Sequence, residues 1–411
     1  MLRLILGRAG SGKTTQVLQR LCRGGPDKRQ ILMVPEQQSH EAERALCRFG
    51  GDGVSLYAEV LSFSRLSNRV FLAAGGMGEP ELDAGGRILM MHRAVRSVAS
   101  QLTVYARPSR RPAFLEELLS TVDELKSCCV RPELLLQAGE EAGAGEGDKL
   151  HDLGLICTAY EALSARTALD PRDRLTRTAE KLRDCSWAQG ADLWLDGFTD
   201  FTPQQQEVLR ELLKQADTVT VTLTCDHLEE DEGGAGIFSP ARRTAAQLLR
   251  LAKQERISCE VETLDGYDPA KSPELQIVER QLFAQERSEP VSCGGAVELF
   301  QASTPRSEVE WTASRIRELV RREGYRYRDM GVVARDFSAY QPLIESVFPR
   351  YEIPVFSSAM TDILEKPILT LVTAALDTVA NGYRYDDVFR YLKTGLTDLS
   401  QEDQDLLENY V

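Results

Sequence analysis

A glycine-rich segment near the start of the chain has residue types and spacing that suit phosphate binding. It fits the P-loop pattern G-x-x-x-x-G-K-[ST], and its residues are Gly7, Arg8, Ala9, Gly10, Ser11, Gly12, Lys13 and Thr14, followed by Thr15. Glycines let successive backbone N–H groups point at phosphate oxygens, and a following helix adds its positive end. Lys13 is predicted to contact the β- and γ-phosphates and the Thr14 hydroxyl to bind Mg²⁺. The segment therefore predicts an ATP site.

A nucleotide site of this kind also needs a carboxylate for the metal and a group that activates water. Asp196, at the end of an apolar segment, fits the first role. In active enzymes of this layout the next residue is normally a glutamate that polarises the attacking water, whereas here it is Gly197, and the nearest acidic residue, Asp200, follows on a loop. The segment 220–226 ends in Thr-Cys-Asp and lacks a glutamine that could sense the γ-phosphate. Because one lost contribution commonly lowers the rate by ~10²–10⁴, we expect nucleotide binding with weak or absent hydrolysis.

Arg335 is a further candidate ligand of the nucleotide. It ends the apolar segment 330–335, and a guanidinium at a strand end can face a γ-phosphate with two hydrogen bonds. On local sequence alone, a surface salt bridge accounts for this residue equally well.

The elements around these residues predict an α/β fold. Segments that predict strands alternate with helical periodicities, which indicates a parallel sheet. The predicted strands of this sheet cover residues 2–6, 30–34, 54–60, 191–197, 218–224 and 258–264. Between residues 80 and 185 the periodicity is helical only, with an exposed loop predicted at 138–148. We therefore expect an all-helical insertion within the α/β domain.

The last part of the chain predicts the start of a second α/β domain. Two strands are expected at 296–301 and 330–335, with a helix at 308–322 between them. Beyond residue 363 the pattern is helical up to the last residue, which is typical of a cut within a longer protein. The predicted parts are a first domain at 1–78 and 188–290, a helical insertion at 79–187, and a partial second domain at 291–411.

Composition restricts the possible partners. The chain has 411 residues and a formal net charge of −14, whereas a free-standing, non-specific DNA-binding protein usually has a basic balance. A local basic channel, for example along 315–328, stays possible. No apolar run reaches the ~18 residues of a membrane span, so we expect a cytoplasmic protein without a membrane partner. The nine cysteines form no C-x-x-C pair and the four histidines stand far apart, so we expect no zinc or iron–sulfur site in this chain.

Several strings of residues resemble superfamily 1 helicases of the UvrD and RecB type, and more closely the N-terminal region of the AddB (RexB) family. These strings are residues 6–14, 34–39, 43–46, 61–66, 195–203, 391–396 and 407–411. Many ATPases share the P-loop, but Asp-Gly-Phe-Thr at 196–199 and Leu-Lys-Thr-Gly-Leu at 392–396 are much more specific. The resemblance runs from end to end of this chain.

The resemblance implies a RecA-like, UvrD-type scaffold that keeps the P-loop and lacks most other helicase motifs, in line with Gly197. AddB-like subunits pair with a motor subunit, AddA, in a helicase–nuclease that processes double-strand breaks for recombinational repair. In the family, a nuclease domain with an iron–sulfur cluster follows C-terminal to the matched region, so neither is expected in this chain.

The resemblance also implies a contact with DNA, because the helicase-like part of the family reads the Chi sequence in the passing single strand. The positions implicated are Gln37, Ser39, Phe63, Arg65 and Asn68. Phe63 could stack on a base and Arg65 could hold a phosphate or base edge, whereas relatives often carry tryptophan at the position of Asn68. The alternatives are a core aromatic for Phe63 and an ordinary polar loop for Gln37 and Ser39.

Two other functions stay open at this point. An active P-loop ATPase or helicase would fit the P-loop, although Gly197 argues against it. A structural DNA clamp would keep the P-loop only as a relic.

Overall fold

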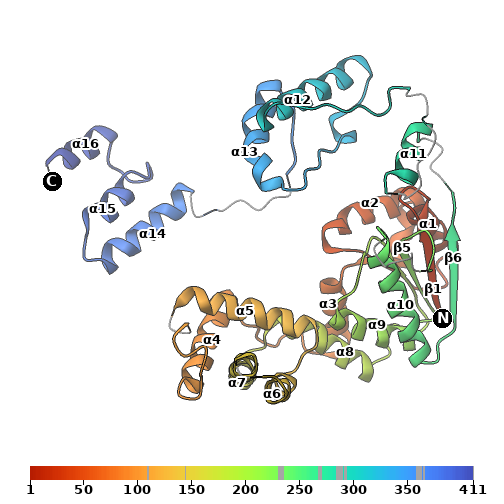
Figure 1. The fold of residues 1–411 in the computed structure, drawn as a ribbon, viewed down its shortest axis with the longest axis horizontal. Helices are drawn as coiled ribbons and strands as arrows, with labels where there is room; N and C mark the ends of the chain where they lie inside the picture. Colours follow the sequence, from red (N-terminus) through yellow and green to blue (C-terminus); the bar gives the residue numbers. More distant parts are fainter. Residues whose placement is uncertain are drawn as a thin grey trace. The chain divides into compact units, whose positions relative to one another are not determined.

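The computed structural model describes residues 1–108, 111–143, 145–229, 236–266, 271–283, 290, 294–357, 363 and 366–410. The chain divides into two compact units, Met1–Val297 and Glu298–Val411 (Figure 1). Among the described residues, none of the helices combines the length and apolar character needed to span a bilayer.

A six-stranded sheet forms the centre of the first unit (Figure 1). In sheet order its strands are β3 (Ala58–Leu61), β2 (Gln30–Met33), β4 (Asp192–Leu195), β5 (Thr218–Thr224), β1 (Leu2–Gly7) and β6 (Cys259–Leu264). Every pairing is parallel, so the predicted parallel α/β sheet is confirmed. Because parallel strands end at the same edge, the ends of β1 and β4 lie on either side of the end of β5.

Helices cover both faces of this sheet, and the alternation along β2 shows how. Ile31 and Met33 belong to one core cluster, whereas Leu32 belongs to another, as the two-residue period of a strand requires. Helices α1 (Lys13–Gly24) and α2 (Ser39–Gly50) cover the face of Leu32. The opposite face is covered by α3 (Phe63–Ala74), α8 (Arg174–Asp184), α9 (Pro203–Gln215) and α10 (Ser239–Gln254).

Between α3 and α8 the chain forms a helical subdomain with its own core. Its helices are α4 (Ala84–Val98), α5 (Pro112–Ser127), α6 (Pro132–Glu141) and α7 (Glu146–Ser164), and buried side chains such as Met91, Leu118 and Ile156 pack between them. The segments entering and leaving this subdomain are joined, because Leu82 N–H donates to Leu169 O at 2.9 Å and Leu169 N–H donates to Pro80 O at 2.8 Å.

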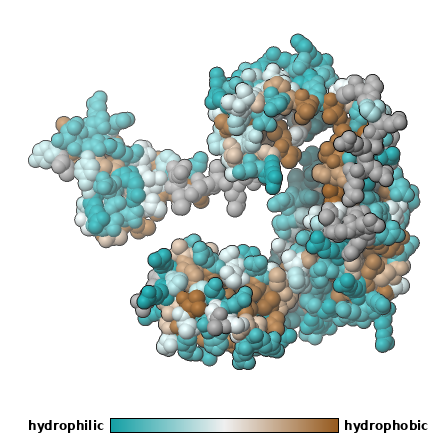
Figure 2. Space-filling view, in the orientation of Figure 1, coloured by the Kyte–Doolittle hydropathy of each residue, from teal (hydrophilic) through white to brown (hydrophobic). Residues whose placement is uncertain are grey.

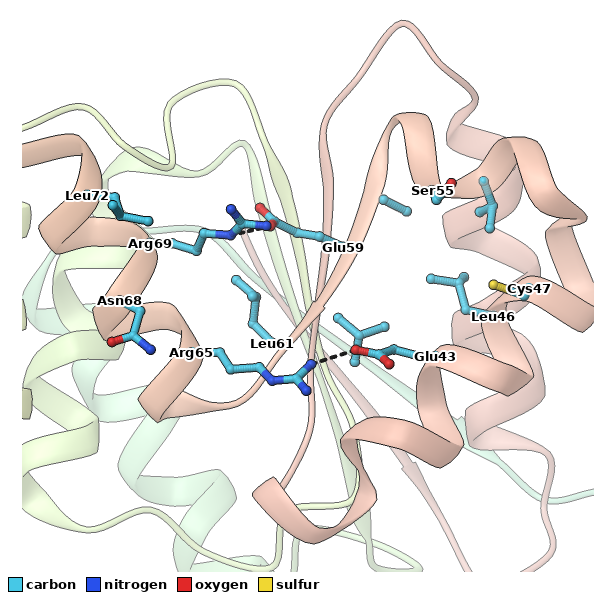
Figure 3. Close-up of a pocket in the computed structure, with 13 residues that line it drawn as sticks. Glu43, Leu46, Cys47, Ser55, Glu59, Leu61, Arg65, Asn68, Arg69 and Leu72 are labelled. Carbon is cyan, nitrogen blue, oxygen red and sulfur yellow. Dashed lines mark hydrogen bonds and ion pairs between the residues drawn. The ribbon is translucent and has the colours of Figure 1, made fainter.

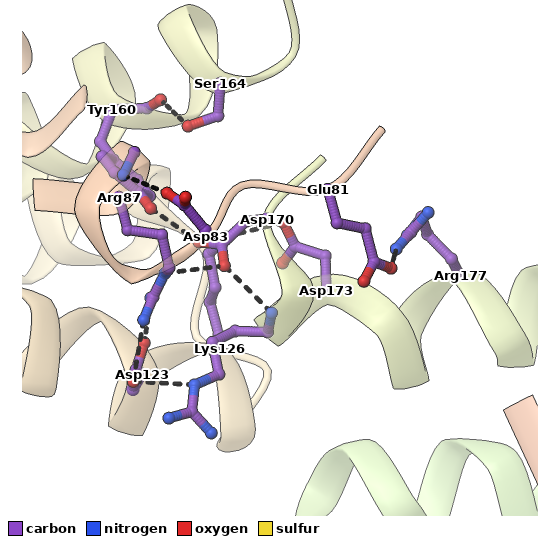
Figure 4. Close-up of polar contacts among 12 residues, drawn as sticks. Glu81, Asp83, Arg87, Asp123, Lys126, Tyr160, Ser164, Asp170, Asp173 and Arg177 are labelled. Atoms are coloured by element: carbon purple, nitrogen blue, oxygen red, sulfur yellow. Dashed lines mark hydrogen bonds and ion pairs between the residues drawn. The ribbon is translucent and has the colours of Figure 1, made fainter. Parts of the chain in front are cut away.

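A buried ion network closes this subdomain around Asp170 (Figure 4). The Asp170 side chain is fully buried and lies 3.1 Å from Arg87 Nε and 3.0 Å from Lys126 Nζ. It also accepts hydrogen bonds from Tyr160 OH at 2.9 Å and from Arg172 N–H at 3.0 Å. Burial alone would raise the pKa of this carboxyl, but the Arg172 hydrogen bond and the charges of Lys126 and Arg87 hold its pKa below the ordinary value. One carboxylate thus ties α4, α5 and α7 together.

The remaining short elements of the first unit connect these parts. They are the 3₁₀ turns η1 (Glu36–Gln38), η2 (Asp52–Leu56) and η4 (Pro171–Asp173), and helix α11 (Pro273–Gln281) after β6.

Two predicted boundaries of the first unit were wrong. The strand predicted at 54–60 is only Ala58–Leu61, because residues 52–56 form η2. The loop predicted at 138–148 is mostly helical, since α6 continues to Glu141 and α7 begins at Glu146. Glycines allow this close packing: a Cβ on Gly147 would lie 2.5 Å from Gly139 O, and a Cβ on Gly139 would lie 3.1 Å from Gly147 O.

The second unit is helical in its described part. It contains α12 (Pro305–Arg322), α13 (Phe337–Val347), α14 (Pro367–Ala380), α15 (Tyr385–Leu392) and α16 (Gln401–Tyr410), with the turns η5 (Tyr327–Asp329) and η6 (Phe348–Tyr351). Val309 and Ile316 of α12 pack against Ile344 of α13. Hydrophobic residues are also visible at the surface of this unit (Figure 2).

The two strands predicted for this unit, at 296–301 and 330–335, are not formed in the described residues. Leu299 is 100% exposed and Val333 93% exposed. A strand needs a neighbouring strand for its backbone hydrogen bonds, and these two segments pair neither with each other nor with another described strand. Both segments have an apolar pattern typical of strands, but the pattern alone does not supply a partner.

Candidate nucleotide-binding site

The segment predicted to bind phosphate connects β1 to α1. Gly10 and Gly12 have φ angles of 79° and 89°, in the left-handed region that glycine adopts without strain. A Cβ on Gly7 would lie 2.2 Å from Ser11 Oγ, so the turn folds tightly onto its own first residue. The order of strand, glycine-rich turn and helix is that expected of a phosphate-binding loop.

Lys13 is folded onto the carbonyl groups of this loop. Its Nζ donates to Gly7 O at 2.6 Å and to Arg8 O at 2.9 Å. Burial lowers the pKa of Lys13, and the negative charges of Asp196 and Glu279 oppose that shift. The ammonium group of Lys13 thus lies within the glycine-rich loop and donates hydrogen bonds to two of its carbonyl oxygens.

The structure brings Thr14 and Asp196 together. Thr14 Oγ1 donates to Asp196 Oδ2 at 2.7 Å, and Thr222 Oγ1 of β5 donates to Asp196 Oδ1 at 2.5 Å. The backbone N–H of Asp196 donates to Met33 O of β2 at 3.0 Å, which fixes the end of β4. A hydroxyl and a carboxylate are hard oxygen donors, and Mg²⁺ bound to phosphates typically takes one or two such protein ligands. These residues fit the predicted metal.

Gly197 follows Asp196 in a left-handed backbone conformation that residues with a side chain rarely adopt. Its φ is 80°, and a Cβ there would lie 2.5 Å from Gln38 Oε1 and 3.4 Å from Pro35 Cδ. The end of the Gln38 side chain therefore lies where a side chain at residue 197 would begin, whereas Pro35 is at ordinary contact distance. Asp200 lies exposed on the loop before α9.

Charged side chains connect the loop to neighbouring elements of the first unit. Arg8 pairs with Asp226 at 3.1 Å, and Asp226 is held by Arg242 of α10 at 2.9 Å. Lys271, which lies before α11, donates to Ala9 O at 3.0 Å and pairs with Glu279 of α11 at 2.8 Å. The Thr-Cys-Asp end of β5 therefore contacts the loop through Asp226, although it lacks a sensing glutamine.

Two of the predicted DNA-contacting residues line a pocket between α2, β3 and α3 (Figure 3). Arg65 is paired with Glu43 at 2.5 Å, and Asn68 accepts a hydrogen bond from Arg174. In the same pocket, Arg69 pairs with Glu59 at 3.0 Å. Arg65 is thus near the surface but carries its counter-ion already.

The other three predicted DNA-contacting residues have different surroundings. Phe63 is 7% exposed, and its ring meets those of Phe198 and Phe201 edge-on at 5.7 and 6.3 Å, which favours the core-aromatic alternative. Gln37 is exposed, whereas Ser39 is 4% exposed and begins α2, with no hydrogen-bond partner for its hydroxyl among the described residues. DNA contact by these residues stays a prediction.

Arg335 belongs to the second unit. It lines a pocket with residues of α12 and α13, among them Glu308 and Tyr340. Its role as a nucleotide ligand also stays a prediction. The basic segment 315–328 is largely neutralised within this unit, because Arg315 pairs with Glu298 at 2.9 Å and Arg326 pairs with Asp329 at 2.7 Å. That favours a solvated surface over a basic channel.

Sequence reasoning missed Thr222, Asp226 and Lys271 as parts of this site. One signal could have indicated Thr222: it is a hydroxyl residue within a strand that alternates Val and Thr, near the edge where the glycine-rich loop and Asp196 lie. Lys271 lies far from the loop in the sequence, and no local pattern connects the two.

Comparison with known proteins gives the chain's relationship. Residues 4–279 match the family described as "ADDB, N-terminal". The B subunit of the ATP-dependent helicase/deoxyribonuclease of Pelotomaculum thermopropionicum is 37% identical over 425 residues, covering 100% of this chain and 37% of the relative. The proteins of the same name from Thermoanaerobacter sp. and Clostridium acetobutylicum are 36% and 34% identical, again over 100% of this chain and 36% of each relative. The chain thus spans little more than a third of the length of these relatives, and by its family match it belongs to the AddB N-terminal family.

Proposed function

We propose that this chain is the ATP-binding, helicase-like scaffold of an AddB-type subunit in an ATP-dependent helicase/deoxyribonuclease. In this proposal the complete subunit acts beside an AddA-type motor subunit on DNA ends, during recombinational repair of double-strand breaks. The chain itself binds ATP with Mg²⁺, has little or no hydrolytic activity of its own, and contributes to binding of single-stranded DNA, including recognition of Chi. The names of the relatives support the helicase–nuclease assignment.

The observation that carries the nucleotide part of the proposal is the meeting of the glycine-rich loop with Asp196. In this geometry Lys13 donates to phosphate oxygens in place of Gly7 O and Arg8 O, and the loop N–H groups and the start of α1 add further donors. Thr14 and Asp196 hold Mg²⁺, which neutralises phosphate charge when bound.

Weak hydrolysis follows from the residue after Asp196. Gly197 has no side chain that could orient a water molecule, and the end of the Gln38 side chain lies where one would begin. Bound nucleotide therefore stabilises the scaffold and does not power movement along DNA.

The DNA part of the proposal rests on the surface at the carboxyl end of β2 and β3. Gln37 and Arg65 are exposed or half-exposed there. A phosphate of single-stranded DNA would replace the Glu43 carboxylate as the ion-pair partner of Arg65.

The test of the nucleotide site is titration of ATP with Mg²⁺ into the Lys13→Ala variant. Loss of a charge-assisted hydrogen bond of about 1.5–3 kcal/mol lowers affinity about 10–100-fold. The matched control is Lys253→Ala, which removes an exposed lysine from the last turn of α10 and should leave affinity unchanged. Equal affinity of wild type and Lys13→Ala would refute the site.

The same preparation separates the two alternative functions. Sustained ATP turnover by the wild-type chain would favour an active P-loop ATPase. Absence of nucleotide binding, with retained single-strand binding that falls steeply with salt, would favour a DNA clamp with a relic P-loop. Titration of strands with and without a Chi-like sequence, in complex with the motor subunit, tests Chi recognition, and equal affinity for both strands would refute it.

A further inference from the structure

Thr222 lies where it can control the orientation of the predicted metal ligand. It is 2% exposed in β5, and it neighbours the end of β4 because Val221 is in register with Leu195. Its hydroxyl donates to Asp196 Oδ1 at 2.5 Å, while Thr14 donates to Oδ2 at 2.7 Å. Resting on the nucleotide site proposed above, we propose that Thr222 is a positioning residue that aims the Asp196 carboxylate at the Mg²⁺ position beside Thr14.

The physical reason is that an aspartate carboxylate rotates easily about its last torsion, whose energy wells are broad. A hydrogen bond to one oxygen sets the plane of the group and leaves the second oxygen for Thr14 and the metal. Thr222 can impose this orientation because a β-branched side chain is stiff at χ1 and because this one is buried within a central strand. An ionised carboxylate only accepts hydrogen bonds, so the Thr222 hydroxyl is the donor.

The same strand contains a control that lacks this contact. Thr220 is 0% exposed, and its hydroxyl has no hydrogen-bond partner among the residues that the structure describes. Thr220 and Thr222 therefore share the strand, the residue type and the burial, and they differ in whether the hydroxyl holds Asp196. Valine has nearly the same shape as threonine and suits a buried strand, so a Thr→Val change at either position removes only the hydroxyl.

The experiment measures ATP affinity by calorimetric titration at a series of Mg²⁺ concentrations and in EDTA, for the wild-type chain and for Thr222→Val, Thr222→Ser and Thr220→Val. Loss of an orienting group behind a metal ligand typically lowers metal affinity 10–100-fold. We expect Thr222→Val to need about 10-fold more Mg²⁺ for half-maximal enhancement of ATP binding. Its ATP affinity in EDTA should equal that of the wild type. Thr222→Ser keeps a donor and should restore most of the Mg²⁺ response, and Thr220→Val should behave as the wild type.

The outcomes separate this inference from the proposed function. A wild-type Mg²⁺ response in Thr222→Val, or an equal loss in Thr220→Val, would overturn the positioning role while leaving the nucleotide site intact. A loss of affinity in EDTA as large as that in Mg²⁺ would show a general structural effect and would equally overturn it. If the wild-type chain bound no nucleotide, the proposed function would fail and this inference with it. Circular-dichroism melting of each variant confirms that the compared chains are folded.

Discussion

Substitution of Gly197 by alanine tests the closed geometry beside Asp196. An L-residue in the left-handed region costs about 1–2 kcal/mol, and Gly197 has a φ of 80°. The added Cβ would also displace Gln38, whose Oε1 would lie at 2.5 Å. Because this atom ends a flexible side chain, its movement adds at most about 1 kcal/mol. We therefore expect Gly197→Ala to lower the free energy of unfolding of the first unit by about 2 kcal/mol.

The assay is urea unfolding followed by circular dichroism, with stability compared through the midpoint at equal slope. The matched control is Gly53→Ala, at an exposed position of η2 where an added Cβ meets nothing within 4 Å and φ is not left-handed. That change should be neutral or stabilising by about 0.4–1 kcal/mol. Equal stability of the two variants would refute the strained conformation at residue 197.

The same geometry predicts that Gly197→Glu does not create an ATPase. A glutamate there would have to displace the Gln38 side chain and adopt a left-handed backbone conformation, and the end of β5 would still lack a glutamine that could sense the γ-phosphate. Substantial turnover by this variant would contradict the reasoning. Two further predictions concern charge. Replacing Asp170 by Asn should destabilise the helical subdomain by about 1.5–3 kcal/mol, the size of a lost charge-assisted hydrogen bond, because Lys126 keeps its ion pair with Asp173 and Arg87 keeps its ion pair with Asp123; melting curves measure this. Since the folded-state pKa of Asp170 lies below its unfolded value, its stabilisation is present above the ordinary aspartate pKa and is lost as pH falls through the folded pKa; the variant should lack this part of the acid dependence. Replacing Glu43 by Gln frees Arg65 and should tighten binding of a labelled single strand several-fold in fluorescence anisotropy at low salt, whereas Glu41→Gln, an equal charge change on the same helix, should have a smaller effect. Equal effects of the two changes would exclude a specific role for Arg65.

The parallel sheet and the strand–turn–helix geometry of the glycine-rich loop could be predicted because their signals are local. Strands buried on both faces are continuous apolar runs, and a glycine-rich turn that ends in Lys-Thr between such a run and a helix is typical of phosphate binding. Asp196 could be placed beside Thr14 because the carboxyl ends of parallel strands share one edge.

Other features depend on contacts that no local pattern contains. Phe63 has the same sequence signal whether it stacks on a base or packs against Phe198, and only the fold shows its burial. The Thr222 contact depends on the register between β4 and β5. The Gly139–Gly147 contact, which turns a predicted loop into helix ends, depends on how α6 and α7 approach each other.

The joined ends of the helical subdomain have a consequence for how the sheet tolerates insertions and deletions in that subdomain. Because Pro80 and Leu82 bond to Leu169, the chain enters and leaves the helical subdomain at neighbouring points. The entropic cost of a closed connection grows only with the logarithm of its length. We therefore expect that residues could be gained or lost within the subdomain with little effect on the start of α1 and the end of β4, which carry Thr14 and Asp196.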